Sequence, residues 1–282
     1  GRGTERLGLL QAAELLAGIR ELKLLLRQPR AERAILLHQR GQSRQEQERI
    51  ESGILAIPET MAKHERLALH VITARAEDSA APWPLPGFPA GFRLCKPVDL
   101  DVDPKLQNYQ LARGTYEQKF LTPLRNAVRH LITGTAAERS PLLHAIEVIM
   151  WSPHFRGDIP RRTLVIYSDF LLHTKELSQL TGPLTDPCRV FGSDIGRRLA
   201  ARNWTGVVVV LEYLRNPRDA ERQTPEHLRF WTRLFYLLGA AQVFNGAALV
   251  TNEETTCEPA QGTSPPRVAR QSGKRSAANK SK

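Results

Sequence analysis

The sequence predicts a single α/β domain with a doubly wound, mostly parallel sheet flanked by helices. Short apolar runs, typical of strands buried on both faces, alternate with longer segments whose apolar residues recur at helical spacing. The alternation fits right-handed helical crossovers between parallel strands. With 282 residues, 41% of them hydrophobic, the chain can form one large core or two small ones, and the regular alternation favours one.

Six segments are predicted to be strands. The clearest is residues 163–168, Thr-Leu-Val-Ile-Tyr-Ser, which is followed directly by Asp169. Residues 92–95 lie inside a long region rich in Pro and Gly, so we expect only a short edge strand there. The other expected strands are residues 34–38, 67–72, 206–211 and 247–250.

Helix boundaries follow from capping residues and prolines. Ser43 can cap a helix that runs to about Ile57, where Pro58 closes it. Another helix starts at Ser140-Pro141, with Pro at a tolerated first-turn position. Further helices are expected at residues 115–132 and 226–238.

The two ends of the chain differ in composition from the predicted domain at residues 31–250. In residues 1–30, apolar side chains recur at helical spacing and predict an amphipathic helix. Residues 251–282 are rich in Gly, Ser, Pro, Ala and Lys/Arg and have no apolar periodicity, which predicts a disordered basic tail. Such a tail either binds nucleic acid weakly and without sequence preference or has no partner and only aids solubility.

Cysteine usage and hydropathy indicate the compartment. Cys95, Cys188 and Cys257 are far apart and form no Cys-x-x-Cys pair, which argues against a structural zinc site or a dense disulfide framework. A reducing, cytoplasmic compartment is the simplest prediction. No uncharged apolar run approaches the ~18 residues of a membrane-spanning helix. Because the chain starts at Gly1 and not at Met, a fragment or a processed form with an upstream signal or anchor stays open.

Two patterns look like metal sites, but the first has the wrong spacing and the second lacks required residues. Residues 64–70 contain two histidines and a glutamate as in zinc proteases, but the histidines are six residues apart instead of four, and a strand is expected between them. Residues 99–103 alternate Asp as at the start of an EF-hand loop, yet Pro104 and Gln110 replace the required Gly and Glu. We interpret this stretch as an acidic solvated loop, with weak Ca²⁺ binding as the alternative.

Patterns for nucleophilic catalysis and nucleotide binding are also incomplete. Residues 192–196 look like a nucleophile elbow, but Phe191 stands where that turn needs Gly. Ser140 and His144 lie one helical turn apart, and no oxyanion donor or third member can be named for them. No glycine-rich phosphate-binding loop occurs. These gaps argue against an enzyme.

The middle of the chain resembles von Willebrand factor A (vWA) domains. The resemblance rests on residues 140–146, Ser-Pro-Leu-Leu-His-Ala-Ile, and on the apolar strand that ends in Ser168-Asp169. In that family a Ser or Thr precedes a similar helix, and an apolar strand ends in Ser-Asp or Thr-Asp. Residues 204–206 and 229–240 are similar to the closing part of a bacterial subgroup, so the resemblance spans residues 34–250.

The resemblance implies a metal site that has decayed. The family holds a divalent cation with Asp-x-Ser-x-Ser after the first strand, a later Thr or Ser, and an Asp after the fourth strand. Ser140 and Asp169 match the last two elements, but residues 38–42 read His-Gln-Arg-Gly-Gln. We expect no cofactor, with weak Mg²⁺ or other divalent-cation binding as the alternative, and hypothesise that Arg40 replaces the metal beside Asp169. The simpler alternatives are that Asp169 is a helix N-cap and that Ser140 caps the helix at Pro141.

These observations predict a non-enzymatic protein-interaction scaffold that binds its partner at the carboxyl ends of the strands. The binding rim would include His38, Arg40, Ser43, Ser140 and Asp169. The alternative is a nucleic-acid accessory protein that binds through its basic tail and N-terminal arginines. A hydrolase on the same sheet is the third hypothesis, for which the sequence supplies no nucleophile, base and oxyanion set.

Overall fold

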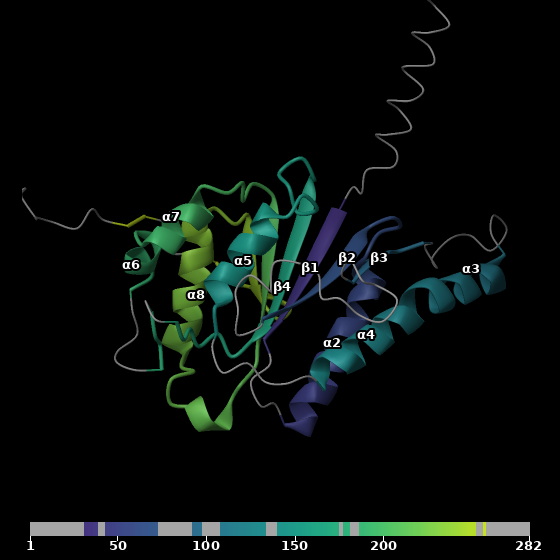
Figure 1. The fold of residues 1–282 in the computed structure, drawn as a ribbon, viewed down its shortest axis with the longest axis horizontal. Helices are drawn as coiled ribbons and strands as arrows, with labels where there is room; N and C mark the ends of the chain where they lie inside the picture. The colour runs from purple at the N-terminus through teal and green to yellow at the C-terminus, as the bar shows by residue number, and fades with distance from the viewer. Residues whose placement is uncertain are drawn as a thin grey trace, which may run out of the picture.

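The computed structural model describes residues 31–38, 43–72, 92–97, 108–133, 140–174, 177–180, 186–251 and 256–257. In these ranges the chain forms a seven-stranded sheet with helices on both faces (Figure 1). The strand order is β3-β2-β1-β4-β5-β6-β7. Strands β2, β1, β4, β5 and β6 are parallel, and the edge strands β3 and β7 are antiparallel to their neighbours. The predicted α/β fold with a mostly parallel sheet is therefore confirmed, and the sheet is mixed.

The observed strands agree with those predicted from the sequence, except at one edge of the sheet. Residues 242–245 were not expected to be a strand, because four residues with a polar residue at each end carry little apolar pattern. A turn at Gly246, whose φ is +56°, reverses the chain into the predicted last strand. The strands are β1 (Ala31–His38), β2 (Arg66–Ile72), β3 (Arg93–Cys95), β4 (Arg161–Ser168), β5 (Val207–Tyr213), β6 (Gln242–Asn245) and β7 (Ala248–Leu249).

One face of the sheet is covered by α2 (Arg44–Thr60) and by a continuous helix made of α3 (Tyr109–Tyr116), the π-helical turn η2 (Glu117–Leu121) and α4 (Thr122–Ile132). Ser43 caps α2 in a capping box, as predicted. The expected end of α2 was wrong, since Pro58 lies inside the helix, which continues to Thr60. The long helix also begins six residues earlier than predicted, because Asn108 caps it by accepting a hydrogen bond from the Leu111 amide.

The opposite face is covered by α5 (Leu142–Trp151), α6 (Pro187–Phe191), α7 (Asp194–Ala200) and α8 (Pro225–Leu238) (Figure 1). A short 3₁₀ turn, η3 (Pro217–Asp219), links β5 to α8. Thr224 caps the start of α8, and Gly239 ends it with a φ of +101° that favours glycine. The larger apolar core lies on this face, with Trp231 and Phe235 fully buried.

A disulfide joins Cys188 of α6 to Cys257, 69 residues later, with the two Cα atoms 5.5 Å apart. The positions of these two cysteines in the sequence do not predict that they pair. Disulfides persist mainly in oxidising compartments, so this pair argues against the expected reducing compartment. The cytoplasmic location stays a prediction.

Several predictions concern residues outside the ranges that the structure describes. They are the N-terminal helix at residues 1–30, the aspartates at residues 99–103 and nearly all of the basic tail at residues 251–282. Within the described ranges, no helix combines the length and the apolar character needed to cross a bilayer.

Candidate functional site

The candidate site lies where β1 and β4 end side by side. From these two neighbouring strands the sheet extends through β2 and β3 in one direction and through β5 and β6 in the other. In doubly wound sheets, the crevice outside the carboxyl ends of two such strands is the usual place for a ligand. His38 is the last residue of β1, Ser168 is the last residue of β4, and Asp169 follows it directly.

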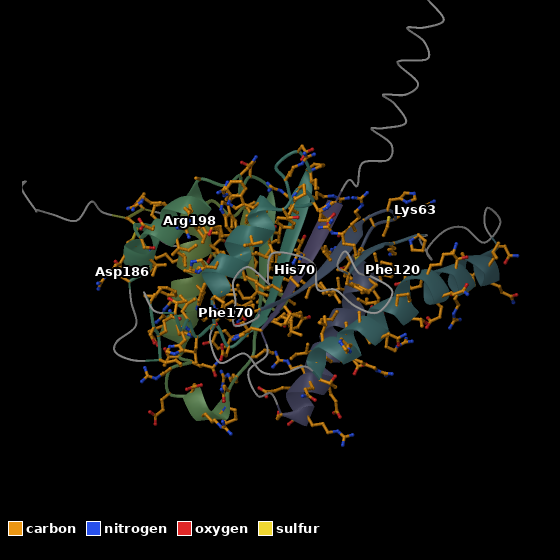
Figure 2. All side chains as sticks on the ribbon, viewed as in Figure 1. Lys63, His70, Phe120, Phe170, Asp186 and Arg198 are labelled. Atoms are coloured by element: carbon orange, nitrogen blue, oxygen red, sulfur yellow. A yellow bond between two sulfur atoms is a disulfide. The ribbon has the colours of Figure 1, made fainter. Side chains whose placement is uncertain are left out.

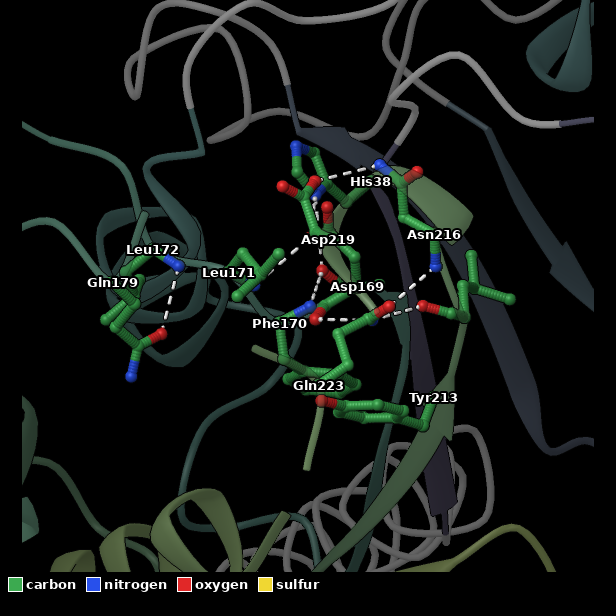
Figure 3. Close-up of polar contacts among 12 residues, drawn as sticks. His38, Asp169, Phe170, Leu171, Leu172, Gln179, Tyr213, Asn216, Asp219 and Gln223 are labelled. Atoms are coloured by element: carbon green, nitrogen blue, oxygen red, sulfur yellow. Dashed lines mark hydrogen bonds and ion pairs between the residues drawn. The ribbon is translucent and has the colours of Figure 1, made fainter. Parts of the chain in front are cut away.

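His38 makes the central contact of the site. Its side chain is fully buried, and its Nδ1 atom lies 3.2 Å from Ser168 Oγ and 3.3 Å from Asp169 Oδ1 (Figure 3). Side chains alternate along a strand, so His38 shares a face of β1 with Ala34 and Leu36 and is held against the larger core. With a proton on Nδ1, the imidazole donates to the Asp169 carboxylate.

The backbone after β4 forms a tight turn and starts no helix. Asp169 Oδ1 accepts a hydrogen bond from the Leu171 amide at 3.1 Å, and Ser168 Oγ accepts one from the Phe170 amide at 2.9 Å. Phe170 has a φ of +57°, which is uncommon for a bulky residue and marks a constrained turn. The alternative of Asp169 as a helix N-cap is therefore wrong, because its carboxylate closes an Asx-type turn within an irregular segment.

Gln223 holds this turn against the end of β5. Its Nε2 donates to the carbonyl oxygens of Asp169 at 3.2 Å and Leu214 at 2.7 Å, and its Oε1 accepts from the Asn216 amide at 2.6 Å (Figure 3). The side chain is 7% exposed. A buried polar side chain with all of these bonds in place rigidifies the backbone around it.

A second buried contact fixes the rest of the loop. His227 Nε2 lies 3.2 Å from Gln179 Oε1, which also accepts from the Leu172 amide at 3.1 Å, and His227 Nδ1 contacts the Tyr213 hydroxyl. Burial lowers the pKa of His227 to about 4, although the Asp169 charge acts in the opposite direction. His227 is therefore neutral at physiological pH and serves as a fixed part of the site's support.

Ser140 lies beside the same loop. It forms an antiparallel β-bridge with His173, in which the Ser140 amide donates to the His173 carbonyl at 3.3 Å. Its hydroxyl is buried and has no hydrogen-bond partner among the residues that the structure describes. The alternative that Ser140 caps the following helix is wrong, since Pro141 occupies the N-cap of α5 and no side chain caps that helix.

The structure brings some of the predicted rim residues together and separates others. His38 and Asp169 touch, and Ser140 lies next to the loop that follows Asp169. Ser43 is exposed and caps α2, and Arg40 lies outside the described ranges. Sequence reasoning missed the support from Gln223, Tyr213, Gln179 and His227, because neither spacing nor a motif connects these positions to Asp169.

In the described part of the chain, no group of three or more His, Cys, Asp or Glu residues is placed to hold a metal ion. Of the rejected zinc pattern, Glu65 forms an ion pair with Arg33, and the residues that follow it form β2 as expected. In comparisons with known proteins, the sequence matches no family model and no curated protein. The resemblance to vWA domains thus stays a prediction.

Proposed function

We propose that this protein is a non-enzymatic protein-interaction module with a vWA-like fold, in which His38 takes the place of the divalent cation. One observation carries the proposal: His38 Nδ1 lies 3.3 Å from Asp169 Oδ1 at the carboxyl ends of β1 and β4. An imidazole that donates to this carboxylate places positive charge beside it, as a metal ion does in vWA domains, the family that the chain resembles. The doubly wound strand order supports the same interpretation.

The geometry of Ser168, His38 and Asp169 favours a structural role over a catalytic one. In a Ser-His-Asp triad the imidazole contacts serine with one nitrogen and aspartate with the other, so that a proton can pass between them. Here the same nitrogen, Nδ1, faces both oxygens. Ser168 is also fully buried and accepts a backbone hydrogen bond, so no substrate carbonyl can reach its oxygen.

A partner would contact the outer rim above this buried pair. Arg215 and Ser43 are exposed there, and His173 and Thr174 are partly exposed. Ser43 and Arg215 line one open cavity of about 640 Å³, so the rim is hollowed and not flat. The nucleic-acid alternative depends mainly on the two ends of the chain, most of which lie outside the described ranges.

Affinity capture with the full chain tests this surface. Arg215→Glu reverses a charge on the rim, and Arg161→Glu is the matched control, since Arg161 is also exposed but lies at the amino end of β4. We expect Arg215→Glu to reduce partner recovery about tenfold, a typical effect of a reversed charge in an interface, while Arg161→Glu leaves it unchanged. Equal recovery by both variants would contradict the proposed rim.

A further inference from the structure

A cavity of about 570 Å³ lies next to the candidate site. Its walls come from the start of α5, the loop after β4, and the helices α6 and α7. Figure 2 shows Arg198 on α7, on the side of the molecule that carries α6 and α7. A volume of this size falls in the range of small-molecule sites, which is about 300–1,000 Å³. The cavity shares its loop with the β-bridge between Ser140 and His173, so both are positioned by the same segment.

Aliphatic side chains form much of the cavity wall. Val190, Leu172 and Leu143 are buried in the larger core, and their accessible edges face the cavity together with the partly buried Leu177 and Ile195. A lining of this kind offers a hydrophobic surface for an apolar group. Removing such a group from water is the main source of affinity in pockets of this kind.

The charged residues of the lining leave one positive charge without a counterion. Arg198 donates two hydrogen bonds to Glu147, at 2.7 and 3.2 Å, which neutralise it. Asp194 is paired with Arg197. In contrast, the guanidinium of Arg189 forms no ion pair or hydrogen bond with any residue in the described ranges.

His144, in the first turn of α5, adds a second polar group that has no side-chain partner in the described part of the chain. Its ring can donate one hydrogen bond in the neutral form. The cavity thus combines an apolar wall with one free guanidinium and one imidazole, and this charge balance fits a ligand with a single negative charge.

The wall that carries Arg189 is fixed before any ligand arrives. Arg189 follows Cys188, whose disulfide to Cys257 fastens α6 to the end of the described chain. Asp186 caps α6 by accepting a hydrogen bond from the Cys188 amide at 3.1 Å. A preorganised wall reduces the entropy lost on binding and so raises affinity.

We propose that this cavity binds a small amphiphilic monocarboxylate, with its carboxylate on Arg189 and His144 and its apolar body against the aliphatic wall. The inference goes beyond the protein-interaction function and does not depend on it: the two surfaces share Thr174, but neither Arg215 nor His38 lines this cavity. Failure of one proposal therefore leaves the other standing.

Isothermal titration calorimetry of the full chain with octanoate and with 3-phenylpropionate tests the inference. For ligands of this size we expect a dissociation constant on the order of 0.1–1 mM for at least one of them. Arg189→Gln should weaken binding about tenfold, because it removes a charged hydrogen-bond partner. Arg161→Gln, which changes an exposed arginine at the amino end of β4, should leave binding unchanged.

A second variant tests the apolar half of the cavity. Ile195→Phe adds volume at a partly buried wall position and should weaken binding about tenfold by occupying ligand space, while circular dichroism confirms the fold. Octan-1-ol, which lacks the charge, should bind at least tenfold more weakly than octanoate. Absence of binding by both carboxylates, or equal affinity of wild type and Arg189→Gln, would overturn the inference.

Discussion

Buried polar residues at the two ends of the parallel sheet differ in how their hydrogen bonds are satisfied, as Asp169 and Gln223 at one end and Glu32 at the other show. At the carboxyl end, Asp169 and Gln223 lie in a network in which their polar atoms have partners. At the amino end, Glu32 is 1% exposed, and neither of its carboxylate oxygens has a hydrogen-bond partner among the described residues. Its ion pair with Arg93 is long, with 4.0 Å between Glu32 Oε1 and Arg93 Nε.

The difference shows how hydrogen bonding decides the state of a buried polar group. A satisfied network fixes backbone geometry, which is what a binding site needs. A buried carboxyl without hydrogen bonds instead changes its protonation. Burial raises the pKa of Glu32 to about 7, although Arg93 and Arg66 act to lower it. The charged form of Glu32 is therefore disfavoured by burial, whereas the Asp169 carboxylate has hydrogen-bond partners.

The largest effect is expected at the carboxyl end. Asp169→Ala removes the partner of His38 and the acceptor of the Leu171 amide. Breaking a buried, hydrogen-bonded pair costs about 3–5 kcal/mol of unfolding free energy, measurable by urea denaturation. Asp158→Ala is the control, because it breaks an exposed ion pair with Arg156, for which we expect a cost of less than about 1 kcal/mol. Similar losses in both variants would contradict the contrast between buried and exposed pairs.

At the amino end, removing the charge should stabilise the protein. Because the pKa of Glu32 rises from its ordinary value of 4.5 to about 7 on folding, the folded state favours the protonated form. Stability is lost as pH rises from 4.5 through 7, by about 3 kcal/mol in total. We expect Glu32→Gln to exceed wild type by that amount at pH 8 and to equal it at pH 4. If Glu32→Gln is less stable than wild type at both pH values, this account is wrong.

His227 should give the opposite pH dependence. Its pKa is lowered from 6.5 to about 4 by burial, so its neutral form stabilises the fold, and stability is lost as pH falls from 6.5 through 4. The shift corresponds to about 3 kcal/mol. Since the two windows overlap, the wild-type contributions of Glu32 and His227 nearly cancel.

The two variants separate these contributions. Urea unfolding at a series of pH values should show stability rising with pH for Glu32→Gln, where His227 acts alone. For His227→Gln it should fall with pH, because Glu32 then acts alone. Parallel profiles for the two variants would show that these groups do not govern the pH response.

Much of the fold was predictable from sequence because buried parallel strands have a strong local pattern. The apolar runs that became β1, β4 and β5 are continuous and β-branched or aliphatic, and the capping box at Ser43 is a local signal. The short helices α6 and α7 were not predicted, since segments of five and seven residues carry little periodicity.

The site was predictable only in part. That His38 and Asp169 would lie at the same edge follows from the ends of two parallel strands, and both were predicted as rim residues. The contact between them, the Asx-type turn and the support from Gln223 depend on tertiary packing. The disulfide between Cys188 and Cys257 is equally non-local, because its two residues approach only when α6 packs beside the end of the chain.

The most direct test of the central claim is calorimetric titration of Mg²⁺ and Mn²⁺ into the 282-residue chain and its His38→Asp and Asp169→Asn variants. If His38 takes the place of the cation, wild type should show no saturable binding. His38→Asp, which restores a carboxylate at that position, should bind with a dissociation constant on the order of 1 mM. Saturable binding by wild type that disappears in Asp169→Asn would show that a metal occupies the site and would contradict the account.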